Sequence, residues 1–106
     1  MAHVAVLSPD LLFGSKVQGM LRAAGHEVDL LGADVPAPGY DLLVVDLMAD
    51  GVDTGALVAG GLPTLGFFNH TETAVRERAL AAGFDLVVPR SRMNREGAEL
   101  VAGLLG

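Results

Sequence analysis

The chain has no cysteine and no tryptophan, and aromatic residues make up only 5% of its 106 residues. Without cysteine it has no disulfide, no thiolate metal site and no cysteine nucleophile, and this composition suits a reducing compartment such as the cytoplasm. Hydrophobic residues nevertheless make up 51% of the chain. Because aromatic side chains are so scarce, we expect a core built mainly from Leu, Val and Ala.

The chain also lacks long apolar runs and clustered positive charge. No run approaches the roughly 20 apolar residues that a helix needs to span a bilayer. The first residues, Met1 to His3, lack the basic region of a signal peptide. The net charge of −6 argues against nucleic acid as a partner, because duplex binding depends on clustered Lys and Arg. These absences predict a cytoplasmic protein that binds neither membranes nor nucleic acid.

Five short apolar runs predict the strands of an α/β domain. The first run is almost continuously apolar, which is typical of a strand covered on both faces. The second alternates polar and apolar residues and is predicted to lie at an edge. The length fits one domain, residues 1–106. The predicted strands are residues 3–7, 26–31, 40–46, 62–68 and 84–89.

The first predicted helix follows directly on the first strand. Ser8 is predicted as its N-cap and Pro9 as its first residue, with Asp10 near the positive end of the helix dipole. Gly25 is suited to the C′ position and is predicted to end the helix. Helical spacing predicts a buried stripe formed by Val17, Met20, Leu21 and Ala24.

Two connections between strands have no room for a full helix. Residues 32–39 contain two prolines and two glycines, so the crossover helix expected there is predicted to be missing. Residues 53–61 form at most two helical turns, because glycine occupies three of these positions.

Two further helices are predicted in the second half of the chain. One covers residues 73–82, with Asn69 or Thr71 as its cap and Gly83 at its end. The other is predicted to begin after an Asn94 cap and to run to the end of the chain. The first of them is expected to bury Val75, Ala79 and Leu80.

Asp46 is the most informative residue of the sequence. It ends an apolar strand and is followed by a loop that contains Asp50 and Gly51. In an open α/β sheet the carboxyl ends of the strands form the ligand-binding edge. The sequence therefore predicts that Asp46 presents a carboxylate at that edge.

Several segments resemble the receiver domain of bacterial response regulators. They are residues 4–7, Asp46 after its strand, the Ala-Leu-Ala-Ala-Gly-Phe-Asp run at residues 79–85, and the basic Arg90 after the last strand. The chain also resembles a group of short, uncharacterised receiver-like proteins with a Pro-Asp-Leu-Leu-Phe start and an Arg-Ser pair after the last strand. The resemblance covers nearly the whole chain. It implies a flavodoxin-like three-layer sandwich with a parallel sheet in the order 2-1-3-4-5, here with the second helix missing and the third shortened.

The residues that a working receiver needs are mostly absent. By the resemblance, Asp46 stands where the phosphoryl group is accepted, but Ser8 and Pro9 occupy the positions of the two acids that help to bind Mg²⁺. Asp10 comes one place late, so the candidate ligands left for a Mg²⁺ site are Asp46 and Asp10. The hydroxyl residue expected after the fourth strand is replaced by Phe68 or, one place later, by Asn69, and the expected lysine is Arg90.

Two roles are open for the cationic residues near this edge. Arg90 can pair with the Asp46 carboxylate and hold the site in one state. Alternatively, His70 at a predicted helix N-terminus can combine with Arg90 and Arg92 into a site for an anion such as phosphate or carboxylate.

Three functions follow from this reading. The first is a non-enzymatic receiver-like signalling module, a pseudo-receiver that acts by protein–protein contact without standard aspartyl phosphorylation. The second is a phosphorylatable receiver that uses Asp46, and the third is a small flavodoxin-like domain that binds an anionic molecule. By the resemblance, a protein partner or a second copy is expected on the face formed by the helix at 73–82, the strand at 84–89 and the last helix. The sequence names no partner.

Overall fold

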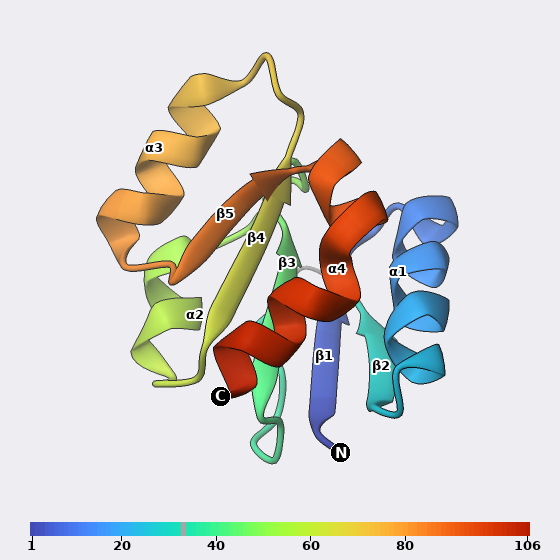
Figure 1. Cartoon of the computed structure of the whole chain (residues 1–106). Helices are drawn as coiled ribbons and strands as arrows, with labels where there is room; N and C mark the ends of the chain where they lie inside the picture. The colour runs from blue at the N-terminus through green and yellow to red at the C-terminus, as the bar shows by residue number, and fades with distance from the viewer. Residues whose placement is uncertain (33) are drawn as a thin grey trace.

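The computed structural model describes residues 1–32 and 34–106 and contains one parallel sheet (Figure 1). The strand order is β2-β1-β3-β4-β5, and every neighbouring pair is parallel. The predicted order and fold class are therefore confirmed. The strands are β1 (His3–Leu7), β2 (Glu27–Leu31), β3 (Leu42–Asp46), β4 (Thr64–Phe68) and β5 (Leu86–Pro89).

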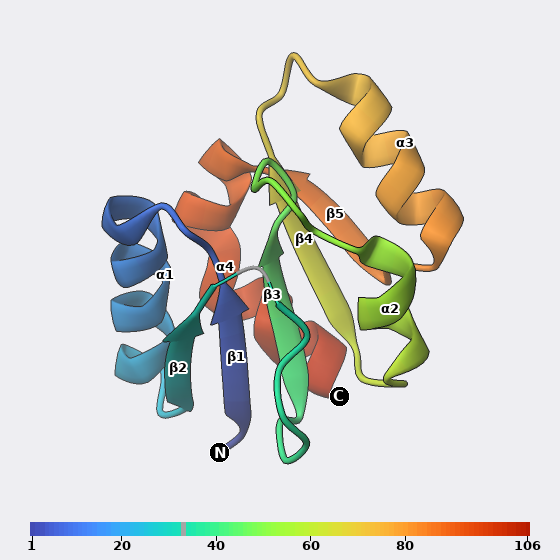
Figure 2. The ribbon, with the colours of Figure 1, turned by 180° about the vertical axis from the view of Figure 1, so that it is seen from behind.

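The helices form the two outer layers of the sandwich. One side of the sheet carries α1 (Leu11–Ala23) and α4 (Arg90–Leu105), which pack against each other, and the other side carries α2 (Thr54–Ala59) and α3 (Thr73–Ala82) (Figures 1 and 2). No described helix is both long and apolar enough to cross a membrane. The last three strands begin two residues later than their apolar runs suggest.

Two apolar clusters fill the spaces between the layers. Because side chains alternate along a strand, each strand gives residues to both clusters. Beneath α1 and α4 lie Val4, Val6, Val17, Leu21, Val28, Leu42, Val44, Leu65, Phe67, Val88, Met93 and Val101. Beneath α2 and α3 lie Ala5, Leu7, Leu43, Val45, Leu47, Leu57, Phe68, Ala79, Phe84 and Val87.

The predicted absence of a helix between β2 and β3 is confirmed for the described residues 32 and 34–41. Figure 2 shows this connection running along the side of the sheet that α2 and α3 also occupy. Its end is tied down by Tyr40, whose hydroxyl donates to Asp29 Oδ2 at 2.7 Å, and His3 Nε2 lies 3.0 Å from the same oxygen. The rings of His3 and Tyr40 pack at 4.4 Å between centroids. These contacts cover part of the sheet without a helix.

The start of α1 differs from its prediction. Asp10, and not Ser8, is the N-cap, because its Oδ1 accepts the backbone N–H of Phe13 at 3.1 Å while the Ser8 hydroxyl turns toward Asp46. Gly25 has a φ of 98°, as a C′ residue requires. The buried helix positions are Gly14, Val17 and Leu21, whereas Met20 is half-buried and Ala24, beyond the last helical residue, is exposed.

The caps predicted for the last two helices are wrong. The N-cap of α3 is Glu72, which makes no side-chain capping bond; Asn69 instead accepts the Glu72 N–H through its backbone carbonyl at 2.8 Å. Leu80, which was predicted to be buried, is exposed. Gly83 ends the helix as predicted and has a left-handed conformation.

The last helix begins earlier than predicted. Pro89 is its N-cap, so α4 starts at Arg90 and Asn94 lies inside the helix. The chain turns from β5 into the helix without a loop, and this turn fixes the position of Arg90 at the sheet edge.

Candidate functional site

Four side chains meet at the carboxyl edge of the sheet. Ser8 follows β1, Asp46 ends β3 and Arg90 follows β5, while Asp10 caps α1 beside them. Ser8 and Asp10 are neighbours in sequence, whereas Asp46 and Arg90 come from distant parts of the chain, and the parallel sheet brings them together because all strand ends point to one edge.

Asp46 is only 2% exposed and is fully engaged. Its Oδ2 accepts the Ser8 hydroxyl at 3.0 Å and Arg90 Nη2 at 3.2 Å. Its Oδ1 accepts the backbone N–H of Met48 at 3.0 Å. A buried carboxylate is costly unless it is paired and hydrogen-bonded, and here both of its oxygens have donors.

Arg90 joins the two carboxylates of the edge. Nη1 donates to Asp10 Oδ2 at 3.1 Å and Nη2 donates to Asp46 Oδ2 at 3.2 Å. The guanidinium carbon also lies 4.9 Å from the centre of the Phe13 ring and 5.6 Å from that of Phe67. Such cation–π contacts add to the ion pairs and restrict the side chain further. Nε is buried and has no hydrogen-bond partner among the described residues.

Asp10 has two tasks in this arrangement. The hydrogen bond from the Phe13 backbone N–H, and after it the bond from Arg90, lower the pKa of Asp10 below its ordinary value of 3.8. One oxygen caps α1 and the other receives Arg90. Asp10 is therefore ionised, and both of its carboxylate oxygens are engaged in structural hydrogen bonds.

A Mg²⁺ ion does not fit this set of donors as they stand. Mg²⁺ takes near-octahedral oxygen ligands at about 2.1 Å. All four carboxylate oxygens of Asp10 and Asp46 already accept hydrogen bonds, and the guanidinium of Arg90 lies against both carboxylates. Within residues 1–32 and 34–106 there is no cluster of three or more His, Cys, Asp or Glu side chains suited to a metal ion.

The three candidate anion ligands have different surroundings. Arg90 is bound to Asp46 and Asp10, and Arg92 Nε lies 3.5 Å from Glu96 Oε2 one turn along α4. His70 is exposed in the turn after β4, and among the described residues it has no hydrogen bond to either arginine. The structure thus joins one of the three residues to Asp46 and leaves the other two outside that network.

Sequence reasoning anticipated the Asp46–Arg90 pair but not all of its neighbours. The second carboxylate on Arg90, from Asp10, and the two rings beside it, Phe13 and Phe67, were not expected. A signal was present for Phe67, because it lies two residues from Leu65 on the same strand face and so points to the α1 side.

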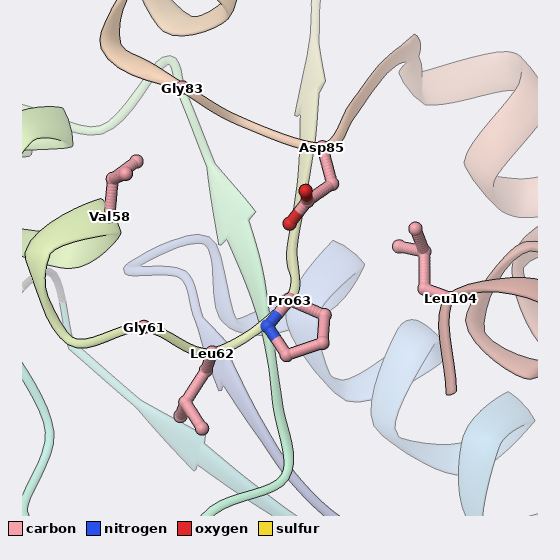
Figure 3. A pocket seen from close by; sticks show the side chains of 7 residues that line it. All are labelled: Val58, Gly61, Leu62, Pro63, Gly83, Asp85 and Leu104. Atoms are coloured by element: carbon pink, nitrogen blue, oxygen red, sulfur yellow. The ribbon is translucent and has the colours of Figure 1, made fainter. Parts of the chain in front are cut away.

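A hollow of about 360 Å³ lies at the opposite edge of the sheet (Figure 3). Pro63 precedes β4 and Asp85 precedes β5, so the hollow is at the amino ends of the strands. Among the described residues, the Asp85 carboxylate is the one charged group that lines it, and its Oδ2 accepts the Thr64 backbone N–H at 2.9 Å. This carboxylate joins β4 to β5, and the remaining walls are mostly aliphatic.

The strand order and the two helix layers define a known fold. The chain has the fold of response-regulator receiver domains. No protein-family model matches the chain. No curated protein matches it by sequence.

Solved receiver structures match over nearly the full length. A response regulator receiver protein from Burkholderia phymatum superposes with a TM-score of 0.84 at 24% identity and covers 100% of this chain and 96% of its own. The receiver domain of a Francisella response regulator gives 0.83 at 16% identity, with 99% and 97% covered. The receiver domain of a Pseudomonas aeruginosa sensor histidine kinase, which has a magnesium ion coordinated in its active-site cleft, gives 0.81 at 17% identity, with 99% and 98% covered. At these identities the similarity establishes the fold.

Proposed function

We propose that this chain is a non-enzymatic, receiver-like signalling module that acts by protein–protein contact and does not use the standard phosphorylation of Asp46. The receiver fold supports a signalling module, and the chemistry of the carboxyl edge argues for the second part. Phosphoryl transfer depends on positioning and on neutralising charge, for which a bound metal ion is the main contributor.

The observation that carries the proposal is the position of Arg90. Its guanidinium bridges Asp10 and Asp46 from inside the site, and Asp46 is 2% exposed. A cation of the chain itself thus replaces the charge that a metal ion would supply. Neither Phe68 nor Asn69 offers the hydroxyl that a receiver carries after its fourth strand. The site is built to remain in one state.

We place the partner, or a second copy of the chain, on the face formed by α3, β5 and α4. Strand β5 lies at an open edge of the sheet, where backbone groups lack a neighbouring strand. Leu80 is 38% exposed on α3. Arg76 and Arg95 are exposed on the two helices that flank β5.

The test is a thermal melt with and without Mg²⁺ plus beryllofluoride, for the parent and for Asp46→Asn. A ligand that binds only the native state must raise the melting temperature. We expect no rise in either protein. A rise in the parent that is absent in Asp46→Asn would overturn the proposal and make the chain a phosphorylatable receiver, in which Arg90 leaves both carboxylates.

The anion-binding function makes a different demand. A phosphate or carboxylate ligand at Arg90 and Arg92 would have to compete with Asp46, Asp10 and Glu96, which already face these arginines. The same melts with phosphate alone separate this function from the other two, because it requires stabilisation by an anion without Mg²⁺.

A further inference from the structure

A second pocket lies beside the Asp46 edge, between the β3–α2 loop and α3. Its volume is about 370 Å³, within the roughly 300–1,000 Å³ that small-molecule sites usually occupy. Asp46 does not line it, and neither does Arg90. The pocket is therefore separate from the site already described, although Leu47, which lines it, directly follows Asp46.

The lining combines apolar side chains with one acid and one base. Leu47, Val52 and Val75 supply the apolar part, and Asp50 and Arg78 supply the charges. Leu47 also closes the floor, because its side chain fills the space above Gly66, where an added Cβ would come within 2.6 Å of it. The apolar floor is a fixed part of the core, since Leu47 is only 8% exposed.

The two charged side chains are left without ion pairs of their own. Among the described residues, neither Asp50 nor Arg78 makes a salt bridge, so the two are not paired with each other across the pocket. Arg90, Arg92 and Arg95 have carboxylate partners, whereas Arg76, which does not line the pocket, makes no salt bridge among the described residues either. A ligand with a single negative charge would be attracted by Arg78 and repelled by Asp50. A ligand with both charges would satisfy both side chains.

We propose that this pocket binds a small zwitterion, namely an α-amino acid with a short aliphatic side chain. Its carboxylate would take hydrogen bonds from the guanidinium of Arg78, which is suited to planar, bidentate recognition of that group. Its ammonium group would donate to Asp50. Its side chain would lie against Leu47, Val52 and Val75. The ligand would thereby bridge α3 and the loop that leads away from Asp46.

The experiment is a ¹H–¹⁵N NMR titration of the full chain with L-valine and L-leucine. N-acetyl-leucine and leucinamide, each of which keeps one of the two charges, serve as matched ligands. We expect saturable shifts of the amides of residues 47–54 and 75–78 with the amino acids, and clearly weaker binding of both analogues. Arg78→Gln should weaken binding by at least about tenfold, because it removes a charge-assisted interaction.

Arg76→Gln is the control variant, because Arg76 is exposed on the same helix and does not line the pocket. It should bind as the parent does. The proposal is overturned if neither amino acid gives saturable shifts, if the single-charge analogues bind equally well, or if Arg78→Gln binds like the parent. Arg78 is exposed, so a dispersed spectrum of the variant will show that it is folded.

Discussion

Two acid-centred clusters have a similar arrangement: one lies at the carboxyl edge of the sheet, and the other lies where Tyr40, at the end of the helix-free β2–β3 connection, contacts β1 and β2. In the first, Asp46 Oδ2 receives Ser8 and Arg90. In the second, Asp29 Oδ2 receives Tyr40 and His3. In each cluster, one carboxylate oxygen thus forms hydrogen bonds with two side chains from distant parts of the chain.

The surroundings of the two clusters are different. Asp46 is 2% exposed and its cation is a permanently charged arginine that lies beside two phenylalanine rings. Asp29 is 48% exposed and its partner His3 is 36% exposed. Burial removes the alternative of bonding to water, so breaking the same hydrogen-bond pattern by removing one partner costs much more stability in the first cluster than in the second. The comparison predicts that the first cluster determines stability and the second adjusts it with pH.

The largest effect is expected from Arg90→Ala. The variant leaves Asp46 buried without its cation, and removing one partner of a buried pair costs on the order of 3 kcal/mol of unfolding free energy. Urea denaturation measures the loss. Arg92→Ala removes a cation of the same helix whose pair with Glu96 is exposed, and it should change stability by less than about 1 kcal/mol. Equal losses in both variants would show that the Asp46 pair is not structural.

A smaller effect concerns metal binding by the same variant. Without the guanidinium, the carboxylates of Asp10 and Asp46 face a space with no cation, so Mg²⁺ should raise the melting temperature of Arg90→Ala more than that of the parent. Na⁺ at matched ionic strength controls for screening. If Mg²⁺ acts equally on both proteins, Arg90 is not what keeps the ion out.

The smallest effect is expected at the exposed cluster, with Tyr40→Phe. The hydrogen bond to Asp29 and, after it, burial raise the pKa of Tyr40 above its ordinary value of 10.0. Because the folded pKa is the higher one, this contribution is fully present below pH 10 and is lost as the pH rises through the raised pKa.

The parent should therefore be slightly more stable than Tyr40→Phe near neutral pH, and the difference should shrink above about pH 10. Melts from pH 6 to 11 measure it. On the acid side, the bond from Tyr40 and then the bond from His3 lower the pKa of Asp29. That contribution is present above pH 3.8 and is lost as the pH falls through the lowered pKa. If the difference in stability between the parent and Tyr40→Phe does not change with pH, the hydrogen bond of the Tyr40 hydroxyl does not contribute.

The elements of the fold were largely readable from local pattern. Strands of this kind are nearly continuous apolar runs, and the run at residues 42–45 is entirely buried, so the pattern and the burial agree. The missing helix was readable because proline and glycine exclude a helix whatever surrounds them. The αL residue at Gly83 was readable for a similar reason.

The helix starts were not readable to the same degree, because several residues at each start are able to cap. Ser8 and Asp10 both have side chains that are able to cap a helix. Asp10 caps α1 because the Ser8 hydroxyl donates instead to Asp46, a residue 38 positions away. Asn94 lost its capping role because α4 begins directly after β5. Local sequence offers these options equally, and only long-range contacts distinguish between them.

The sequence by itself determined the order of strands and helices, the gap between β2 and β3, and the presence of a carboxylate at the end of β3. These depend on backbone preferences and on hydrophobic alternation, which act within a few residues. Only the tertiary structure decided that Arg90 bridges Asp46 and Asp10 beside the rings of Phe13 and Phe67. That arrangement depends on where β5 ends relative to β3 and α1, and such relative positions follow from the packing of the whole sheet.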